Sequence, residues 1–89
     1  MTVNARIQEK LAALEPVALE IHDDSAKHAG HEGAKSGGGH YRVVIVSRRF
    51  AGLSIQLRHR MVYDALGSMM QKEIHALAIK AYAPEEVHR

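Results

Sequence analysis

Apolar side chains near the N-terminus recur at helical spacing. They are Val3, Ile7, Leu11 and Leu14. Charged and polar side chains fill the positions between them, so the segment carries one apolar stripe, as an amphipathic helix does. The pattern predicts a helix over residues 2–14. Pro16 prevents the helix from continuing, because a proline disfavours helical backbone at the residue before it, here Glu15.

Three short segments have the patterns of β-strands. Residues 17–22 alternate between apolar and other side chains, which predicts a strand buried on one face. The apolar side of that alternation consists of Val17, Leu19 and Ile21. Residues 40–47 are rich in β-branched side chains and are predicted to pair antiparallel with the first strand. Residues 74–82 form the third predicted strand, which Pro84 ends.

The region between the second and third predicted strands is predicted to be helical. Residues 48–53 form a turn that leads to Ser54, a residue type that commonly caps helices. From there to about Gln71, a series of positions falls near helical spacing, with Gly67 as a weak point. The positions are Ile55, Arg58, Val62, Leu66, Met69 and Met70. The helix is expected to be either continuous or divided into a short helix and a longer one.

The order of these elements predicts the fold class. A helix, two strands, a helical region and a third strand indicate an α+β protein, with helices packed on one face of a three-stranded sheet. The 89 residues fit one domain, so residues 1–89 are interpreted as a single unit. Residues 23–39 lack a periodic pattern and are rich in glycine and histidine, which predicts a flexible loop. A loop this long in so small a domain tends to be functional.

The chain has seven histidines and no cysteine. Imidazole can ligate zinc, copper or iron, whereas thiolate sites are out of reach for this chain alone. Any iron–sulfur cluster must therefore take its cysteine ligands from elsewhere. The lack of disulfides favours a reducing compartment. Neither a signal peptide nor an apolar run of about 20 residues is apparent, so we expect a cytoplasmic protein that does not enter membranes.

The formal net charge of +2 is unevenly distributed. Residues 1–39 carry four basic and six acidic side chains, whereas residues 40–63 carry five arginines and no acidic residue. Guanidinium groups donate paired hydrogen bonds to phosphate or carboxylate, so this segment is either a solvated face or a binding surface. The arginines proposed for a nucleic-acid surface are Arg48, Arg49, Arg58 and Arg60.

Several motifs resemble the signature of the BolA family in order and spacing. The main ones are residues 50–54 (FAGLS), 58–63 (RHRMVY) and 74–77 (IHAL). Shorter matches occur at residues 24–25 (DS), 28–29 (HA), 40–41 (HY) and 84–85 (PE). The likeness extends over essentially the whole chain. It implies a fold similar to a class II KH domain, with the order αββααβ, which agrees with the elements predicted from the hydrophobic pattern.

The resemblance also implies a function. It suggests a non-enzymatic partner of a monothiol glutaredoxin, with a [2Fe–2S] cluster shared between the two chains. In that family the glutaredoxin contributes its cysteine and a bound glutathione thiol. The BolA-like chain contributes the histidine that opens the last strand and a loop residue, which correspond here to His75 and His28, with His31 as a competitor. The isolated chain is expected to carry no cluster and to be a monomer or a weak homodimer.

The remaining histidines have ordinary structural explanations. His59 lies between two arginines and is expected to support the fold. His22 and His40 lie at strand ends on either side of the loop, where they could help to define its base. His88 is close to the end of the chain and suggests no role. A zinc or nickel site among the loop histidines is a minor alternative.

Two other classes of function are less favoured. A KH module clamps nucleic acid with a GxxG loop between two helices, but the only GxxG, at residues 30–33, falls between predicted strands. Arg48 and Arg49 with the helix after Ser54 could approach DNA as a helix-turn-helix does, although the low net charge predicts weak binding. An enzyme is not expected, because the sequence has no nucleophile elbow, phosphate-binding loop or HExxH motif.

Overall fold

The N-terminal helix forms as its apolar stripe predicts. The computed structural model of the protein describes residues 2–24 and 39–87. Helix α1, Val3–Leu11, begins at Thr2, whose side chain accepts a hydrogen bond of 3.0 Å from the Ala5 amide. A 3₁₀ turn, η1, Ala12–Leu14, continues it, and the helix ends where Glu15 adopts a left-handed φ of 52° ahead of Pro16.

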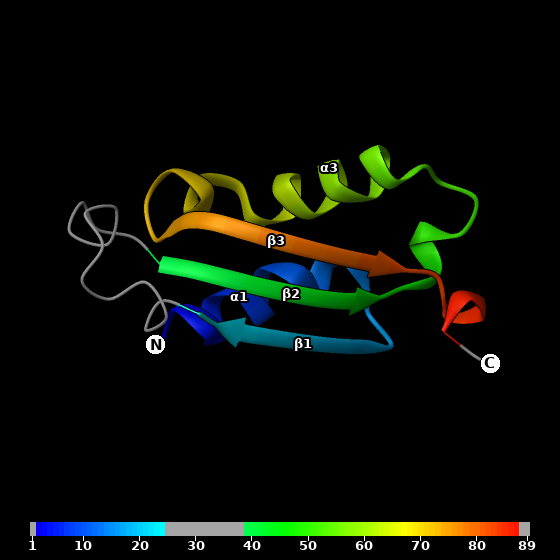
Figure 1. Ribbon diagram of the computed structural model, residues 1–89, viewed down its shortest axis with the longest axis horizontal. Coiled ribbons are helices and arrows are strands. Elements are labelled where there is room, and N and C mark those ends of the chain that lie inside the picture. The colour runs from blue at the N-terminus through cyan, green and yellow to red at the C-terminus, as the bar shows by residue number, and fades with distance from the viewer. Residues whose placement is uncertain (1, 25–38, 88–89) are drawn as a thin grey trace.

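Three strands form one sheet in the order β1-β2-β3 (Figure 1). They are β1, Ala18–Asp23; β2, Gly39–Val46; and β3, Ile74–Tyr82. β1 and β2 are antiparallel as predicted, whereas β2 and β3 are parallel. The third strand has the predicted bounds. The first strand begins one residue later than predicted, at Ala18. Val17 lies before the strand and is 56% exposed, so its predicted place on the buried face with Leu19 and Ile21 is wrong.

Helical structure connects β2 to β3 in three parts. A 3₁₀ turn, η3, spans Arg48–Phe50, helix α3 spans Ile55–Leu66, and a second 3₁₀ turn, η4, spans Gly67–Gln71. The predicted cap is confirmed, since the Ser54 side chain accepts a hydrogen bond from the Leu57 amide at 3.2 Å. The predicted weak point is confirmed as well: Gly67 has a φ of 57°, and α3 ends there. A final 3₁₀ turn, η5, spans Pro84–Glu86.

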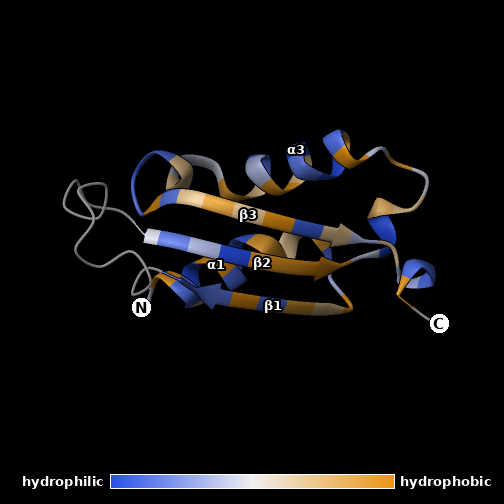
Figure 2. Ribbon diagram, in the orientation of Figure 1, coloured by the Kyte–Doolittle hydropathy of each residue, from blue (hydrophilic) through white to orange (hydrophobic). Residues whose placement is uncertain are grey.

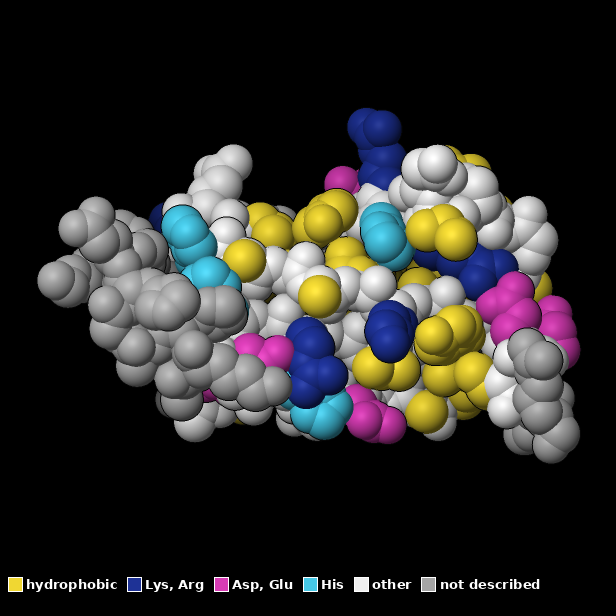
Figure 3. Space-filling view, viewed as in Figure 1, with side chains coloured by type: hydrophobic (Ala, Val, Ile, Leu, Met, Phe, Trp, Pro, Cys, Tyr) yellow, Lys and Arg dark blue, Asp and Glu magenta, His cyan; other side chains and the backbone are white. Residues whose placement is uncertain are grey.

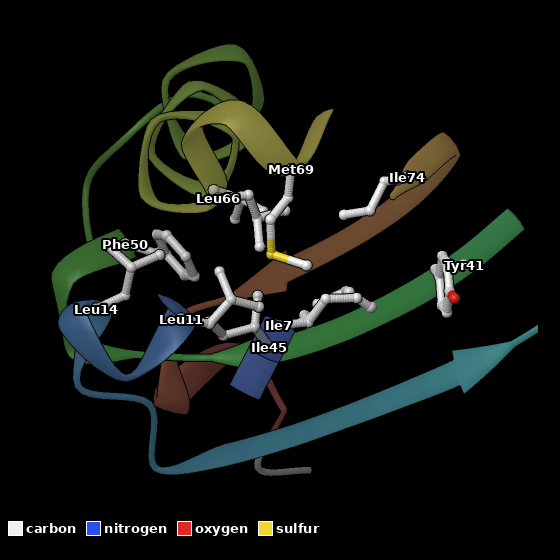
Figure 4. Close-up of a cluster of buried hydrophobic side chains, with 11 residues drawn as sticks. Ile7, Leu11, Leu14, Tyr41, Ile45, Phe50, Leu66, Met69 and Ile74 are labelled. Atoms are coloured by element: carbon white, nitrogen blue, oxygen red, sulfur yellow. The ribbon is translucent and has the colours of Figure 1, made fainter. Parts of the chain in front are cut away.

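The core lies between the helices and one face of the sheet (Figure 4). Its buried side chains are Ile7, Leu11, Leu14, Tyr41, Val43, Ile45, Phe50, Val62, Leu66, Met69 and Ile74. The other face of the sheet is open, with exposed residues along all three strands. This arrangement confirms the predicted α+β class. Across the described ranges, neither α-helix combines the length and apolar content needed to cross a membrane.

The hydropathy of β2 changes along its length (Figure 2). Its first half is hydrophilic and contains His40 and Arg42, whereas its second half is hydrophobic and contains Val43 and Ile45 of the core. β2 is also the central strand, flanked on both sides. The polar end of the sheet is therefore the end where β2 and β3 both begin.

Candidate metal centre at the start of the sheet

His75 is the extra residue of a β-bulge. Across the parallel pair, Gly39 is opposite Ile74, but the next residue, His40, is opposite Ala76. One residue of β3 therefore has no counterpart on β2, and that residue is His75. Ile74 points into the core and is buried, whereas His75 is exposed. Bulges re-aim a side chain relative to the regular alternation of a strand, so this one sets the direction of the imidazole.

The bulge brings the His75 ring beside the ring of His40. The two ring centroids are 5.2 Å apart, and the planes are inclined by 52°. Figure 3 shows two adjoining histidine side chains at this end of the open face. Sequence reasoning placed His40 at the base of the loop and did not pair it with His75. Within residues 2–24 and 39–87, no group of three or more histidine, aspartate or glutamate side chains is suited to a metal ion.

A shallow depression of about 350 Å³ adjoins this pair on the open face. Its lining includes Asp24, His40, Arg42, Ala76 and Ala78. Arg42 donates a hydrogen bond of 2.6 Å from Nε to the Asp24 carboxylate, and the Asp24 amide donates to the His40 carbonyl at 2.7 Å. The depression is therefore lined by the Arg42–Asp24 ion pair and by the small side chains of Ala76 and Ala78.

His28 and His31, the loop ligand and its competitor, lie outside the described residues, as does His88. Of the remaining histidines, His22 contacts Glu20 with 3.1 Å between Nε2 and Oε1, and His59 is half-buried on α3. His75 and His40 are thus the two histidines that the described structure brings together.

Arg58 belongs to the fold and not to the surface predicted to approach nucleic acid. Its side chain is only 9% exposed. Nε donates to the Leu53 carbonyl at 3.0 Å, and Nη1 donates to the Ala81 carbonyl at 3.0 Å. The guanidinium also binds both carboxylate oxygens of Glu86, at 2.6 and 2.8 Å. The arginine therefore fastens the start of α3 to the end of β3 and to the turn after it.

Glu86 completes this arrangement from the C-terminal side. Its Oε1 also accepts a hydrogen bond of 2.8 Å from the Ala83 amide, which opens the η5 turn. The hydrogen bonds from Arg58, together with the Ala83 amide, lower the pKa of Glu86 from 4.5 to about 2. The same pairing raises the pKa of Arg58. Both groups are therefore charged throughout the physiological pH range.

The depressed pKa of Glu86 predicts a pH-dependent contribution to stability. The contribution is fully present above the unfolded-state pKa and is lost as the pH falls towards about 2. We expect Glu86→Gln to lower the melting temperature near pH 6, and the difference from wild type to shrink as the pH is lowered to about 3. Thermal unfolding followed by circular dichroism measures this. Glu85→Gln is the matched control, and a Glu86→Gln difference that stays constant with pH would contradict the assignment.

The other three predicted arginines differ in their surroundings. Arg49 pairs with Glu15, with 3.0 Å from Nε and 2.9 Å from Nη2 to the same carboxylate oxygen. Arg48 and Arg60 are exposed. The arginine stretch therefore does not form one continuous binding surface: one member is buried, one is paired with an acid, and two point to solvent.

The fold and the paired histidines define a small α+β protein that presents imidazoles at one end of an open sheet. Residues 11–86 match the family model described as BolA-like protein. The chain therefore belongs to the BolA-like family. It is 42% identical over 87 residues to the DNA-binding transcriptional regulator BolA of Escherichia coli, covering 97% of this chain and 80% of that protein.

Other relatives support the same assignment. The chain is 42% identical to BolA-like protein 1 of Mus musculus, covering 94% of this chain and 60% of that protein. Among solved structures, the BolA domain of SufE1 from Arabidopsis thaliana is 43% identical with a TM-score of 0.83, covering 98% of this chain and 99% of that one. BolA1 from the same plant is 38% identical with a TM-score of 0.83, covering 99% of each.

Proposed function

We propose that this chain is a non-enzymatic, cytoplasmic partner of a monothiol glutaredoxin, with which it shares a [2Fe–2S] cluster. Its role would be in the assembly or trafficking of such clusters or in iron regulation. The observation that carries the proposal is the exposed imidazole of His75 on its β-bulge, beside a second imidazole, in a chain without cysteine. Membership of the BolA-like family supports it.

The donor set fits one half of such a cluster. A [2Fe–2S] cluster has four terminal ligands, and imidazoles on one iron raise its reduction potential above that of an all-cysteine cluster. In the proposal, the glutaredoxin cysteine and a glutathione thiol ligate one iron, and two imidazoles of this chain ligate the other. His75 is the first of these imidazoles. The sequence-based candidates for the second are His28 and, in competition with it, His31.

Size-exclusion chromatography with absorbance detection tests the proposal. The chain would be mixed anaerobically with a monothiol glutaredoxin, glutathione, iron and sulfide. We expect a coloured complex that contains both proteins in equal amounts, because each supplies half of the ligands. The proposal fails if the colour elutes with glutaredoxin alone and this chain elutes separately.

DNA binding is the second candidate function. The relative from Escherichia coli is named a DNA-binding transcriptional regulator, and Arg48 and Arg60 are exposed. Against it, the guanidinium of Arg58 is committed to the fold and that of Arg49 to Glu15. Any affinity for DNA would therefore rest on few phosphate contacts.

A gel-shift titration on duplex DNA measures this second candidate. We expect dissociation constants no tighter than about 10⁻⁶ M, with strong dependence on salt, as for non-specific binding. Arg48→Ala with Arg60→Ala is expected to reduce the salt slope by roughly 2, since each phosphate contact contributes about one unit. Lys72→Ala is the control. The absence of any shift at low salt would reject DNA binding by this chain.

A further inference from the structure

We infer that the open face of the sheet is a self-association surface, on which a second copy of this chain docks face to face with its strands nearly parallel to those of the first. The surface belongs to the isolated chain and needs neither a cluster nor a glutaredoxin. Three rows of side chains that run across the strands carry the inference, because they are complementary to their own copies in charge and in size.

The alternation of side chains along the strands defines which residues occupy the open face. Tyr41, Val43 and Ile45 of β2 belong to the core, so Val44 and Val46 point to the other side of the sheet. The same alternation holds on β1 and β3, whose core-facing residues are also separated by open-face residues. The strand register groups the open-face side chains into rows: His22, Arg42 and Ala78; Glu20, Val44 and Lys80; and Ala18, Val46 and Tyr82.

The middle row carries opposite charges on the two outer strands. The Glu20 side chain on β1 is 67% exposed, and Lys80 on β3 is exposed and forms no ion pair with another described residue. A two-fold axis that runs along β2 places Glu20 of each copy opposite the partner's Lys80, so the row forms two ion pairs. An axis across the strands would instead place Glu20 opposite the partner's Glu20. Charge therefore selects the nearly parallel arrangement.

The rows on either side of the middle row match in size under the same axis. Ala18 of one copy lies opposite the partner's Tyr82, and His22 lies opposite the partner's Ala78. A large side chain of one sheet therefore meets a small one of the other, as in sheets whose side chains interdigitate. Figure 3 shows hydrophobic side chains gathered over the half of the open face where β2 and β3 end.

Arg42 limits the contact to this half of the face. It lies on the same axis and faces the partner's Arg42. Its Nε donates to the Asp24 carboxylate at 2.6 Å, and the negative charge of Asp24 offsets the repulsion between the two arginines. Packed sheets also cross at about 30°, so the strands diverge with distance from the middle row. The end of the sheet that carries His75 stays uncovered.

The size of the face predicts weak association. Strands about 4.8 Å apart, with a rise of about 3.3 Å per residue, give three strands roughly 330 Å² of flat area over about seven residues. Each partner of a stable complex buries about 800 Å², which is considerably more. We therefore expect a dissociation constant on the order of 10⁻⁴ to 10⁻³ M.

Sedimentation equilibrium of the full chain at up to about 1 mM measures this constant. We expect Glu20→Lys and Lys80→Glu each to weaken association by about tenfold or more, because each substitution puts like charges at both ion pairs of the dimer. An equimolar mixture of the two variants should associate as tightly as wild type does, because each contact then joins opposite charges. A monomeric wild type, or a mixture no tighter than the single variants, would overturn the inference.

The matched controls make the same changes of charge on the helix layer. Glu9→Lys and Lys10→Glu alter exposed positions of α1 and should keep the wild-type constant, alone and mixed. Equal losses in these controls would show general charge repulsion and sink the inference. The double variant Glu20→Lys with Lys80→Glu guards against a folding defect, which far-ultraviolet circular dichroism detects. It restores both contacts and should return to the wild-type constant, and a folded double variant that stays dissociated would also overturn the inference.

Amide resonances of an isotope-labelled chain show which surface associates. On dilution, we expect the signals that move to belong to the open-face rows of the three strands. Movement around the exposed side chains of Ile55 and Leu57 instead would show association through the helix layer and reject the open face. Open-face signals that move only when glutaredoxin is added would assign the face to that partner, which overturns self-association and leaves the proposed function in place.

Discussion

Replacement of Arg58 by alanine is expected to lower the melting temperature by on the order of 10 °C or more. The change removes the hydrogen bonds to the carbonyls of Leu53 and Ala81 and leaves the Glu86 carboxylate without its paired donor. Partly buried groups that lose a charged partner are costly, because they are not fully solvated by water. Thermal unfolding followed by circular dichroism is the measurement.

Two variants sharpen the test of Arg58. Arg60→Ala removes an exposed arginine from the same helix and should change the melting temperature little. Arg58→Lys keeps the charge but cannot form the paired hydrogen bonds to Glu86, so it should lie between wild type and alanine. Equal melting temperatures for Arg58→Ala and Arg60→Ala would contradict the structural role described above.

Replacement of His75 by alanine is expected to shorten the lifetime of the proposed shared cluster by roughly tenfold or more, since the change removes the imidazole proposed as a metal ligand. The side chain is exposed, so the fold should be retained. The measurement is the loss of visible absorbance of the glutaredoxin complex after addition of an iron chelator.

His22→Ala is the matched control for this experiment. His22 also belongs to a strand of the same sheet, but its ring contacts Glu20 and not the histidine pair. The control complex should lose its colour at the wild-type rate. Equal lifetimes for His75→Ala and His22→Ala would show that His75 is not a ligand.

The hydrophobic pattern was sufficient to predict the elements, because each depends on residues close in sequence. The stripe from Val3 to Leu14 predicted α1 and its 3₁₀ continuation, and Pro84 marked the end of β3. The division of the second helical region was less predictable. Within residues 54–71 the longer helix, α3, comes first and the 3₁₀ turn η4 follows it, since the left-handed backbone at Gly67 ends α3 there.

The pairing of His40 with His75 could not be predicted in this way. It depends on the register between two strands that begin at Gly39 and Ile74, 35 positions apart in the sequence, and on a one-residue bulge in that register. No local pattern in the sequence marks the bulge. The resemblance to BolA-like proteins predicts His75 as one ligand and His28 or His31 as the other, and the two loop histidines lie outside the described residues.

The sequence contains a signal for the buried position of Arg58. Arg58 occupies a position in the helical series with Val62 and Leu66, both of which are buried in the core. An arginine at such a position indicates a buried charge that needs an acidic partner, and Glu86 follows the last strand. The neighbouring arginines favour a nucleic-acid-binding surface instead, because the spacing of residues along the helix does not show that Glu86 will lie beside Arg58.

Visible circular dichroism of the glutaredoxin complex tests the central proposal most directly, because this signal reports the asymmetric surroundings of the cluster. Glutaredoxin and glutathione would be reconstituted with iron and sulfide in the presence of wild-type chain, of His75→Ala, or of no second protein. The proposal predicts that wild type gives a spectrum of its own, complete at one chain per glutaredoxin, and that His75→Ala does not reproduce it. Identical spectra for wild type and His75→Ala would contradict the assignment of His75 as a cluster ligand.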